Sequence, residues 1–281
     1  MRRDVRHRCR SVWGPISRWV ARRAALLSVA ALGSAVVGVA PGRCAALEDG
    51  AEQYRYHLIA DVDRTLANAR MLASSAAAGD LARAKRAWIE ARVGWERCEV
   101  FTSGFVPELD RDIDAWPNGA VGFHAIEAKL FGANRTDFVT EANELVRNLT
   151  ELRARVADTP LTPQGLLDGI VRLAYEVGES KVDGGESRVS GTSLDDMRNN
   201  VDGIELAWRT IFAQTAESRD RQVDAGIRRS VEELKAMVEV RELRRVDPDR
   251  LRTATEELVL KLQSAAPLLH LEKPTLEAGA R

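Results

Sequence analysis

The chain has 281 residues, of which 45% are hydrophobic and 30% charged, and its formal net charge is −1. Residues 1–46, interpreted below as an export signal, hold nine Lys/Arg and one Asp/Glu, so the remaining chain has 32 basic and 41 acidic residues and a net charge of −9. An acidic globular body of this kind disfavours nucleic-acid binding and raises the local concentration of cations.

The first segment has the pattern of an export signal. A basic stretch precedes an uncharged run of small and apolar residues, Ala24 to Ala40, which is shorter than the roughly 20 residues of a membrane span. Small residues up to Ala46 predict signal-peptide cleavage after that residue. Arg22-Arg23 before the apolar run is consistent with twin-arginine export, and Sec export is the alternative. Lipid attachment at Cys44 is a further alternative, which Arg43 disfavours because a small residue is expected there.

Residues 47–281 form one predicted domain. Helix signals occupy nearly all of it, and no run of alternating β-branched residues predicts a strand. We therefore expect an all-α bundle of seven or eight helices, with no integral membrane segment after signal cleavage. The first helix is expected from about Glu48 to Ala78, where Gly79 ends it. Asp80 caps a second, antiparallel helix from Leu81 to about Phe101.

Later helix starts carry their own signals. Thr162-Pro163 and Asp247-Pro248 each place a capping side chain before proline at the first helical position. Ser193 with Asp196 resembles a capping box. Between the helices we expect two loops, Thr102 to Ala120 with prolines and acids, and Val182 to Thr192 with several glycines.

Two carboxylates share one face of the second predicted helix. Glu96 and Glu99 are one turn apart, on the strip beside a predicted core stripe. The stripe consists of Trp88, Ala91, Trp95 and Cys98. The alternative is an ordinary solvated flank, on which Arg92 pairs with Glu96. Cys98 is the only cysteine left after signal cleavage, so the domain has no intrachain disulfide.

A second pair of ligand-type residues follows the first predicted loop. In "GFHAIEAKLFG", Gly122 to Gly132, His124 and Glu127 are one turn apart and can converge on one ion. A surface histidine beside a glutamate is the alternative for such a pair on its own. Two pairs from facing helices of a bundle are, however, a known way to assemble a carboxylate-rich metal site.

Four segments carry a family resemblance. They are "WERCE", "DRDIDAWP", "GFHAIEAKLFG" and "ESKVDGGESRVSGTSLDDMRNNVDGI". In this order and spacing they resemble the landmarks of the imelysin-like family, in particular the EfeO/EfeM-type periplasmic iron-uptake proteins. The landmarks of the last segment fall on Lys181, Glu186, Asp196 and Asn200, among others. Asp202 departs from the pattern, since the family usually has glutamate there.

The resemblance implies both a function and a site. The function is capture of iron outside the cytoplasmic membrane and its delivery to a permease of the EfeU type, with a haem-dependent peroxidase as a further partner. The length indicates the shorter, EfeM-like form without a cupredoxin domain. The implied metal ligands are Glu96, Glu99, Asp114, His124 and Glu127, gathered at one ion. Carboxylates with one imidazole suit Fe(III), Fe(II) or Zn(II) rather than Cu(I).

Two other classes of function compete with a binding protein. The histidine motif of the family has led to its description as a group of peptidases, so an imelysin-type metallopeptidase is the alternative function. The His-Glu-x-x-His pattern of zinc hydrolases is missing from the sequence, which favours binding over catalysis. A purely structural helical protein would leave the two acidic pairs on unrelated faces.

Several other residues are expected to have ordinary roles. The expected core tryptophans are Trp88, Trp95 and Trp208. His57 and His270 are expected on the surface. Asp110 and Asp112 are candidates for a cation entry path, and a solvated acidic loop is the alternative.

Overall fold

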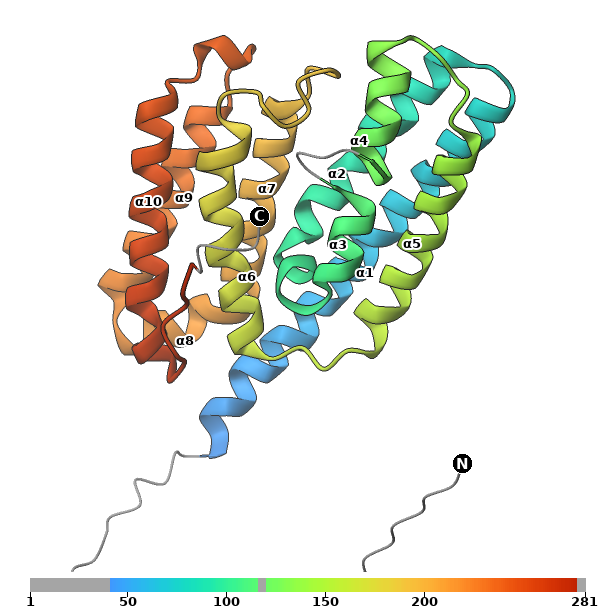
Figure 1. The fold of residues 1–281 in the computed structure, drawn as a ribbon. Helices are drawn as coiled ribbons and strands as arrows, with labels where there is room; N and C mark the ends of the chain where they lie inside the picture. Colours follow the sequence, from blue (N-terminus) through green and yellow to red (C-terminus); the bar gives the residue numbers. More distant parts are fainter. Residues whose placement is uncertain (1–40, 116–119, 277–281) are drawn as a thin grey trace, which may run out of the picture. The chain divides into compact units, whose positions relative to one another are not determined.

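The computed structural model describes residues 41–115 and 120–276, and in those ranges it contains helices and no strands (Figure 1). The all-α class predicted from the sequence is therefore confirmed. Residues 1–40, which hold most of the predicted export signal, lie outside the described residues, as does the side chain of Cys44. Within the described ranges, no helix combines the length and apolar character that crossing a membrane requires.

The described residues contain ten α-helices, more than the seven or eight predicted, and seven of them have 14 or more residues. They are α1 (Pro41–Ala77), α2 (Leu81–Phe105), α5 (Val139–Asp158), α6 (Pro163–Glu176), α7 (Ser193–Ala207), α9 (Arg221–Val238) and α10 (Pro248–Ala265). The shorter helices are α3 (Pro107–Ile113), α4 (Gly122–Glu127) and α8 (Ala213–Arg219). The π-helical turns η1 (Ala128–Gly132), η2 (Val177–Lys181) and η3 (Trp208–Phe212) continue α4, α6 and α7, and the 3₁₀ turns are η4 (Leu243–Arg245) and η5 (Ala266–Leu269).

Helix α2 packs against two groups of helices. It contacts α1, which also packs on α5, and it contacts α6 and α7, which in turn pack on α10 and α9 (Figure 1). The short helix α3 touches α2, α5 and α4. Because α2 belongs to both groups, side chains from its middle can meet residues of α3 and α4 as well as residues of α6 and α7.

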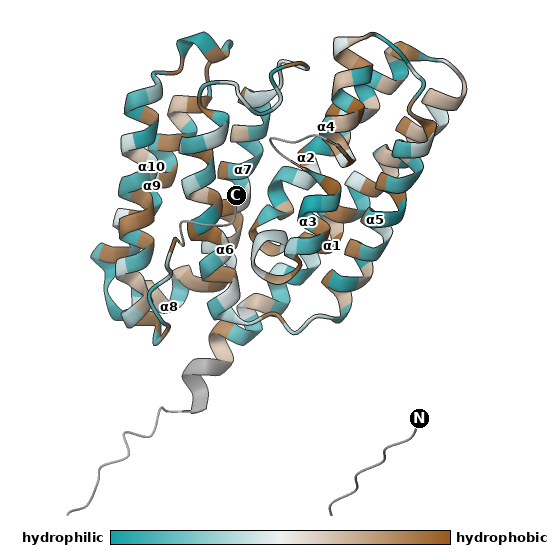
Figure 2. Cartoon of the chain, viewed as in Figure 1, coloured by the Kyte–Doolittle hydropathy of each residue, from teal (hydrophilic) through white to brown (hydrophobic). Residues whose placement is uncertain are grey.

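The core follows the predicted pattern. Every long helix carries both hydrophilic and hydrophobic residues (Figure 2), and the buried hydrophobic residues of these helices form one core cluster. The predicted stripe of α2 is buried, and Cys98 within it is a free thiol. Trp88, Trp95 and Trp208 are core residues, as expected, and His57 and His270 are exposed.

Three predicted helix starts are confirmed. The Asp80 side chain accepts a hydrogen bond from a backbone N–H of the first turn of α2. Thr162 does the same for α6, and Asp247 for α10, each directly before a proline.

The predicted capping box at the start of α7 is wrong. Thr192 is the N-cap residue and makes no side-chain capping bond, so Ser193 is the first helical residue. The Ser193 hydroxyl donates instead to the Glu186 carbonyl, and Asp196 accepts a hydrogen bond from the Ser187 hydroxyl. Buried contacts with the preceding loop therefore take both side chains away from the cap.

Two predicted boundaries also differ from the structure. Helix α1 begins at Pro41, ahead of the predicted start near Glu48, and the predicted cleavage point after Ala46 falls within it. The predicted loop from Thr102 to Ala120 contains α3, because Pro107 fits the first helical turn and acids follow it there. The loop from Val182 to Thr192 is confirmed as non-helical.

Gly122, the first residue of α4, is expected to tolerate no side chain. Its φ is +68°, and an added Cβ would lie 2.0 Å from the Ile113 carbonyl oxygen. Gly122→Ala should therefore lower the free energy of unfolding by more than the roughly 1–3 kcal/mol of a strained φ alone. Gly79→Ala is the matched control, because Gly79 has φ +69° but nothing within 4 Å of the added atom. Equal losses for the two variants in urea unfolding would contradict the predicted clash.

Candidate metal centre

The five predicted ligands come from three elements that meet beside α2. Glu96 and Glu99 project from α2, Asp114 follows α3, and His124 and Glu127 lie on α4. Their side chains are all at most 11% exposed. A solvated flank at Glu96 and Glu99 is therefore wrong, and burial of ionised groups on this scale requires charged partners.

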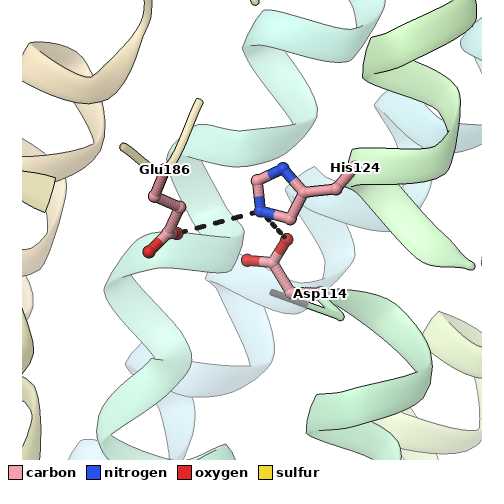
Figure 3. Close-up of side chains that lie close together, drawn as sticks. All are labelled: Asp114, His124 and Glu186. Carbon is pink, nitrogen blue, oxygen red and sulfur yellow. Dashed lines mark ion pairs between the residues drawn. The ribbon is translucent and has the colours of Figure 1, made fainter. Parts of the chain in front are cut away.

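His124 directs its two ring nitrogens toward different partners. Nε2 lies 3.1 Å from Asp114 Oδ1 and 4.0 Å from Glu186 Oε1 (Figure 3). Nδ1 lies 2.9 Å from Glu127 Oε2, and Glu127 Oε1 accepts hydrogen bonds of 2.7 Å from both the backbone N–H and the hydroxyl of Ser190. Burial opposes protonation of the ring, but the contacts with Asp114 and Glu127 outweigh burial and raise the pKa of His124 to about 10.

A buried arginine lies among the carboxylates. Arg92 forms ion pairs with Glu96, Asp114, Glu186 and Asp196. Its Nη1 lies 2.6 Å from Asp114 Oδ1, while Nη2 contacts the other three. The guanidinium carbon also lies 5.5 Å from the ring centre of Trp88 and 5.4 Å from that of Phe123. Arg92 is thus held by both aromatic rings and charged partners.

A buried lysine contacts the other side of the same cluster. Lys181, the last residue of η2, places Nζ against Glu96 Oε2, 3.3 Å from Glu99 Oε2 and 3.2 Å from Glu186 Oε1. Asn200 of α7 donates its side-chain amide to the same two oxygens of Glu96 and Glu99, at 2.9 and 2.7 Å. The cluster therefore joins α2 to η2, to α7 and to the loop between them.

The carboxylates differ in their affinity for protons. Burial and the neighbouring Glu96 carboxylate raise the pKa of Glu99 well above its usual value. Burial opposes ionisation of Glu96, but Arg92 and Lys181 outweigh it and lower its pKa. Burial raises the pKa of Asp196 to about 7. Glu99 and Asp196 therefore bind a proton more tightly than Glu96 does.

The described residues contain three groups of potential ligands, and within each group the ligand atoms lie within 4.8 Å of one another. They are Asp114 with His124 and Glu186, Glu96 with Glu186 and Asp196, and Glu96 with Glu99 and Asp114. Because Glu96, Asp114 and Glu186 each belong to two groups, the three groups form one continuous site. Glu127 belongs to none of them, since it contacts Nδ1 of His124 while the other carboxylates lie near Nε2.

The site contains members that spacing along the chain does not predict. Sequence similarity marks Lys181, Glu186, Asp196 and Asn200, but assigns them no contact with α2. Their distance in sequence from Glu96 is bridged by the packing of α6 and α7 on α2. The family resemblance is the one signal in the sequence that points to them.

The two acids predicted for a cation entry path lie on α3. Asp110 is half-buried and accepts a hydrogen bond of 2.6 Å from Thr102 Oγ1. Burial raises the pKa of Asp110 to about 6. Asp112 is exposed. An entry role for these two acids stays a prediction.

The residues of this site fall within a recognised family pattern. The family model described as "Peptidase_M75: Imelysin" matches residues 51–121 and 118–269. The chain belongs to the imelysin family. The matched ranges include the glutamates of α2, the His124–Glu127 pair and the segment from Lys181 to Asn200.

Several curated proteins are similar to the chain. It is 26% identical over 210 residues to an "Efem/EfeO family lipoprotein" of Staphylococcus haemolyticus, covering 69% of the chain and 71% of the relative. It is 28% identical over 177 residues to the "Iron uptake system component EfeM" of Pseudomonas syringae, with coverages of 60% and 62%. It is 31% identical over 163 residues to the "Iron uptake system component EfeO" of Yersinia pseudotuberculosis, with coverages of 54% and 43%. The chain thus spans less than two thirds of the last two relatives.

A solved structure has the same fold. It is the crystal structure of a chain from Parabacteroides distasonis described as an iron-regulated protein A precursor. The TM-score is 0.65 at 16% sequence identity, and the alignment covers 83% of this imelysin and 96% of that chain. At this identity the similarity supports the fold alone.

Proposed function

We propose that this imelysin takes part in iron uptake, by capturing iron outside the cytoplasmic membrane and delivering it to a membrane permease. The names of the EfeM and EfeO relatives support a role in iron uptake. Relatives named as lipoproteins indicate an extracytoplasmic protein, which agrees with the predicted export signal. A permease of the EfeU type and a haem-dependent peroxidase are the partners that we propose from the family resemblance.

The observation that carries the proposal is the continuous cluster of carboxylates around one imidazole. Carboxylate oxygens and a histidine nitrogen suit a hard or borderline cation such as iron, and the free thiol of Cys98 lies in the apolar stripe. The names of the relatives give no support to zinc, so iron is the proposed cargo.

We propose specific roles for the predicted ligands. Glu96, Glu99, Asp114 and His124 Nε2 hold the ion, and Glu186 and Asp196 complete the oxygen donors. For an ion at Nε2, the Glu127 carboxylate on Nδ1 orients the imidazole, as carboxylates beside metal-bound histidines commonly do. Direct ligation by Glu127 requires an ion on the Nδ1 side instead.

A second candidate function is that of a metallopeptidase, which the printed name of the family model favours. A zinc hydrolase of the familiar kind uses two or three histidines, or two histidines and a glutamate, with an open position for water. In the described part of the chain, His124 alone is in the cluster, and the other two histidines, His57 and His270, are exposed. The donor set is thus better suited to holding an ion than to activating water on zinc.

One preparation of the exported protein tests both candidates. We expect it to bind about one Fe(III) per chain in a titration with iron held by nitrilotriacetate, since the three ligand groups are continuous. We also expect no metal-dependent cleavage of casein or of peptide libraries. Failure to bind iron would overturn the proposal. Reproducible cleavage that Glu127→Gln abolishes would establish the peptidase.

A further inference from the structure

The buried ammonium of one lysine occupies a position that also suits a metal ion. The ammonium of Lys181 contacts carboxylate oxygens of Glu96, Glu99 and Glu186, and its side chain is 2% exposed. Lysine is almost never buried to this extent unless it is paired. Oxygens of this type are also the ligands of hard metal cations. A metal ion bound by these carboxylates would therefore compete with the Lys181 ammonium for the same oxygens.

The two buried cations of the site differ in how firmly they are held. Arg92 lies on α2, between two aromatic rings and four carboxylates, so its departure would disrupt the core. Lys181 carries a compact charge on a flexible four-carbon stem. It ends the π-helical turn η2 and precedes a loop in which Gly184 and Gly191 have positive φ. π-helical turns are frequent at functional sites. The flexible stem of Lys181 can change rotamer more readily than the guanidinium of Arg92, which contacts two aromatic rings.

A partly exposed edge of the site lies near the end of α6. Glu176, five residues before Lys181, has a side chain that is 30% exposed and pairs with Arg172 at 2.9 Å. A turn of the lysine stem toward this edge would let water solvate the ammonium while it leaves Glu96 and Glu99.

We propose that Lys181 is an exchangeable counter-ion: iron enters by displacing its ammonium from Glu96, Glu99 and Glu186, and the returning ammonium helps to release the iron. The inference rests on the proposed iron-binding function. It accounts for how buried carboxylates remain compensated when no ion is bound. It also limits entry to cations of higher charge, because Coulomb attraction to the same oxygens grows with the charge of the ion.

Removal of the ammonium tests the exchange. Lys181→Met keeps the length of the side chain and should tighten Fe(III) binding by about tenfold or more, measured against nitrilotriacetate, because no internal cation then competes. The same variant should melt at a lower temperature without iron and recover when iron is added. Lys235→Met is the matched control. Lys235 lies 2.8 Å from Asp202 Oδ1 and 2.6 Å from Glu205 Oε2, but its side chain is 43% exposed, so no change in iron affinity is expected.

A second measurement uses the unaltered protein and so does not depend on the folding of a variant. Acylation by N-hydroxysuccinimide acetate, read by peptide mass spectrometry, should label Lys181 faster after loading with Fe(III), because its amine has left the buried cluster. Labelling of Lys235 should stay the same.

The results of these two experiments distinguish a failure of the Lys181 exchange from a failure of the proposed iron binding. Unchanged or weaker iron affinity in folded Lys181→Met protein, or continued protection of Lys181 in the iron-loaded protein, overturns the counter-ion role while iron binding by the unaltered protein stands. If neither the unaltered protein nor the variant binds iron, the proposed function fails together with the exchange.

Discussion

Replacing Arg92 by methionine is expected to lower the free energy of unfolding of the iron-free protein by about 3–5 kcal/mol. The substitution preserves an unbranched side chain but removes the cation that four carboxylates share. Removing one partner of a buried ion pair leaves uncompensated charge in a medium that solvates it poorly. Urea unfolding near neutral pH, with a chelator present, would measure the loss.

Arg64→Met is the matched control for this expectation. Arg64 pairs with Glu90 at 2.8 Å, but the two side chains are 45% and 53% exposed. Such a surface pair is worth about 0–1 kcal/mol, so its loss should barely move the unfolding midpoint. A similarly small effect at Arg92 would mean that Glu96 and Asp114 are protonated in the iron-free protein, although Arg92 lowers the pKa of both, and would contradict the charged network.

The local part of the fold could be predicted from the sequence. Asp80 and Thr162 cap their helices through their own neighbours, so the signals lie within four residues of the bonds they make. The stripe of α2 was predictable for the same reason, because core positions repeat with the helical period. Ser193 shows the limit of this approach. Its hydroxyl bonds to the loop that carries Glu186, and this tertiary contact overrides the local capping signal.

The candidate site was predictable only in part. Spacing along a helix explains why Glu96 and Glu99 share a face, and why His124 reaches Glu127. Spacing does not reveal that Lys181 lies against Glu96, since 85 residues separate them and the packing of helices brings them together. Spacing also does not reveal whether these carboxylates lie in water or in the protein interior. A carboxylate pair beside an apolar stripe could be solvated or buried, and a pair between Arg92 and Glu96 fits either case. The burial of Glu96 follows from the packing of α6 and α7 on α2.

A double-mutant cycle on Glu96 and His124 is expected to be strongly non-additive in iron binding. The two residues lie in different groups of potential ligands, but Asp114 and Glu186 each belong to a group with Glu96 and to a group with His124. Loss of either side chain therefore damages the same coordination sphere. The summed effects of Glu96→Gln and His124→Ala should exceed the effect of the double variant by about 0.5–3 kcal/mol, the range found for residues that share partners.

The choice of substitution and control decides what the cycle can show. Glu96→Gln retains the volume of the side chain and its capacity to accept a hydrogen bond from Asn200, whereas truncation would also open a cavity in the core. His57→Ala is the matched control, because His57 is an exposed histidine of α1, and its effect should be negligible and additive with that of Glu96→Gln. If the Glu96 and His124 effects add as well, and two ions bind per chain, then the two helical pairs hold separate ions. If they fail to add and one ion binds, the carboxylates of α2 and the imidazole of α4 act on the same iron.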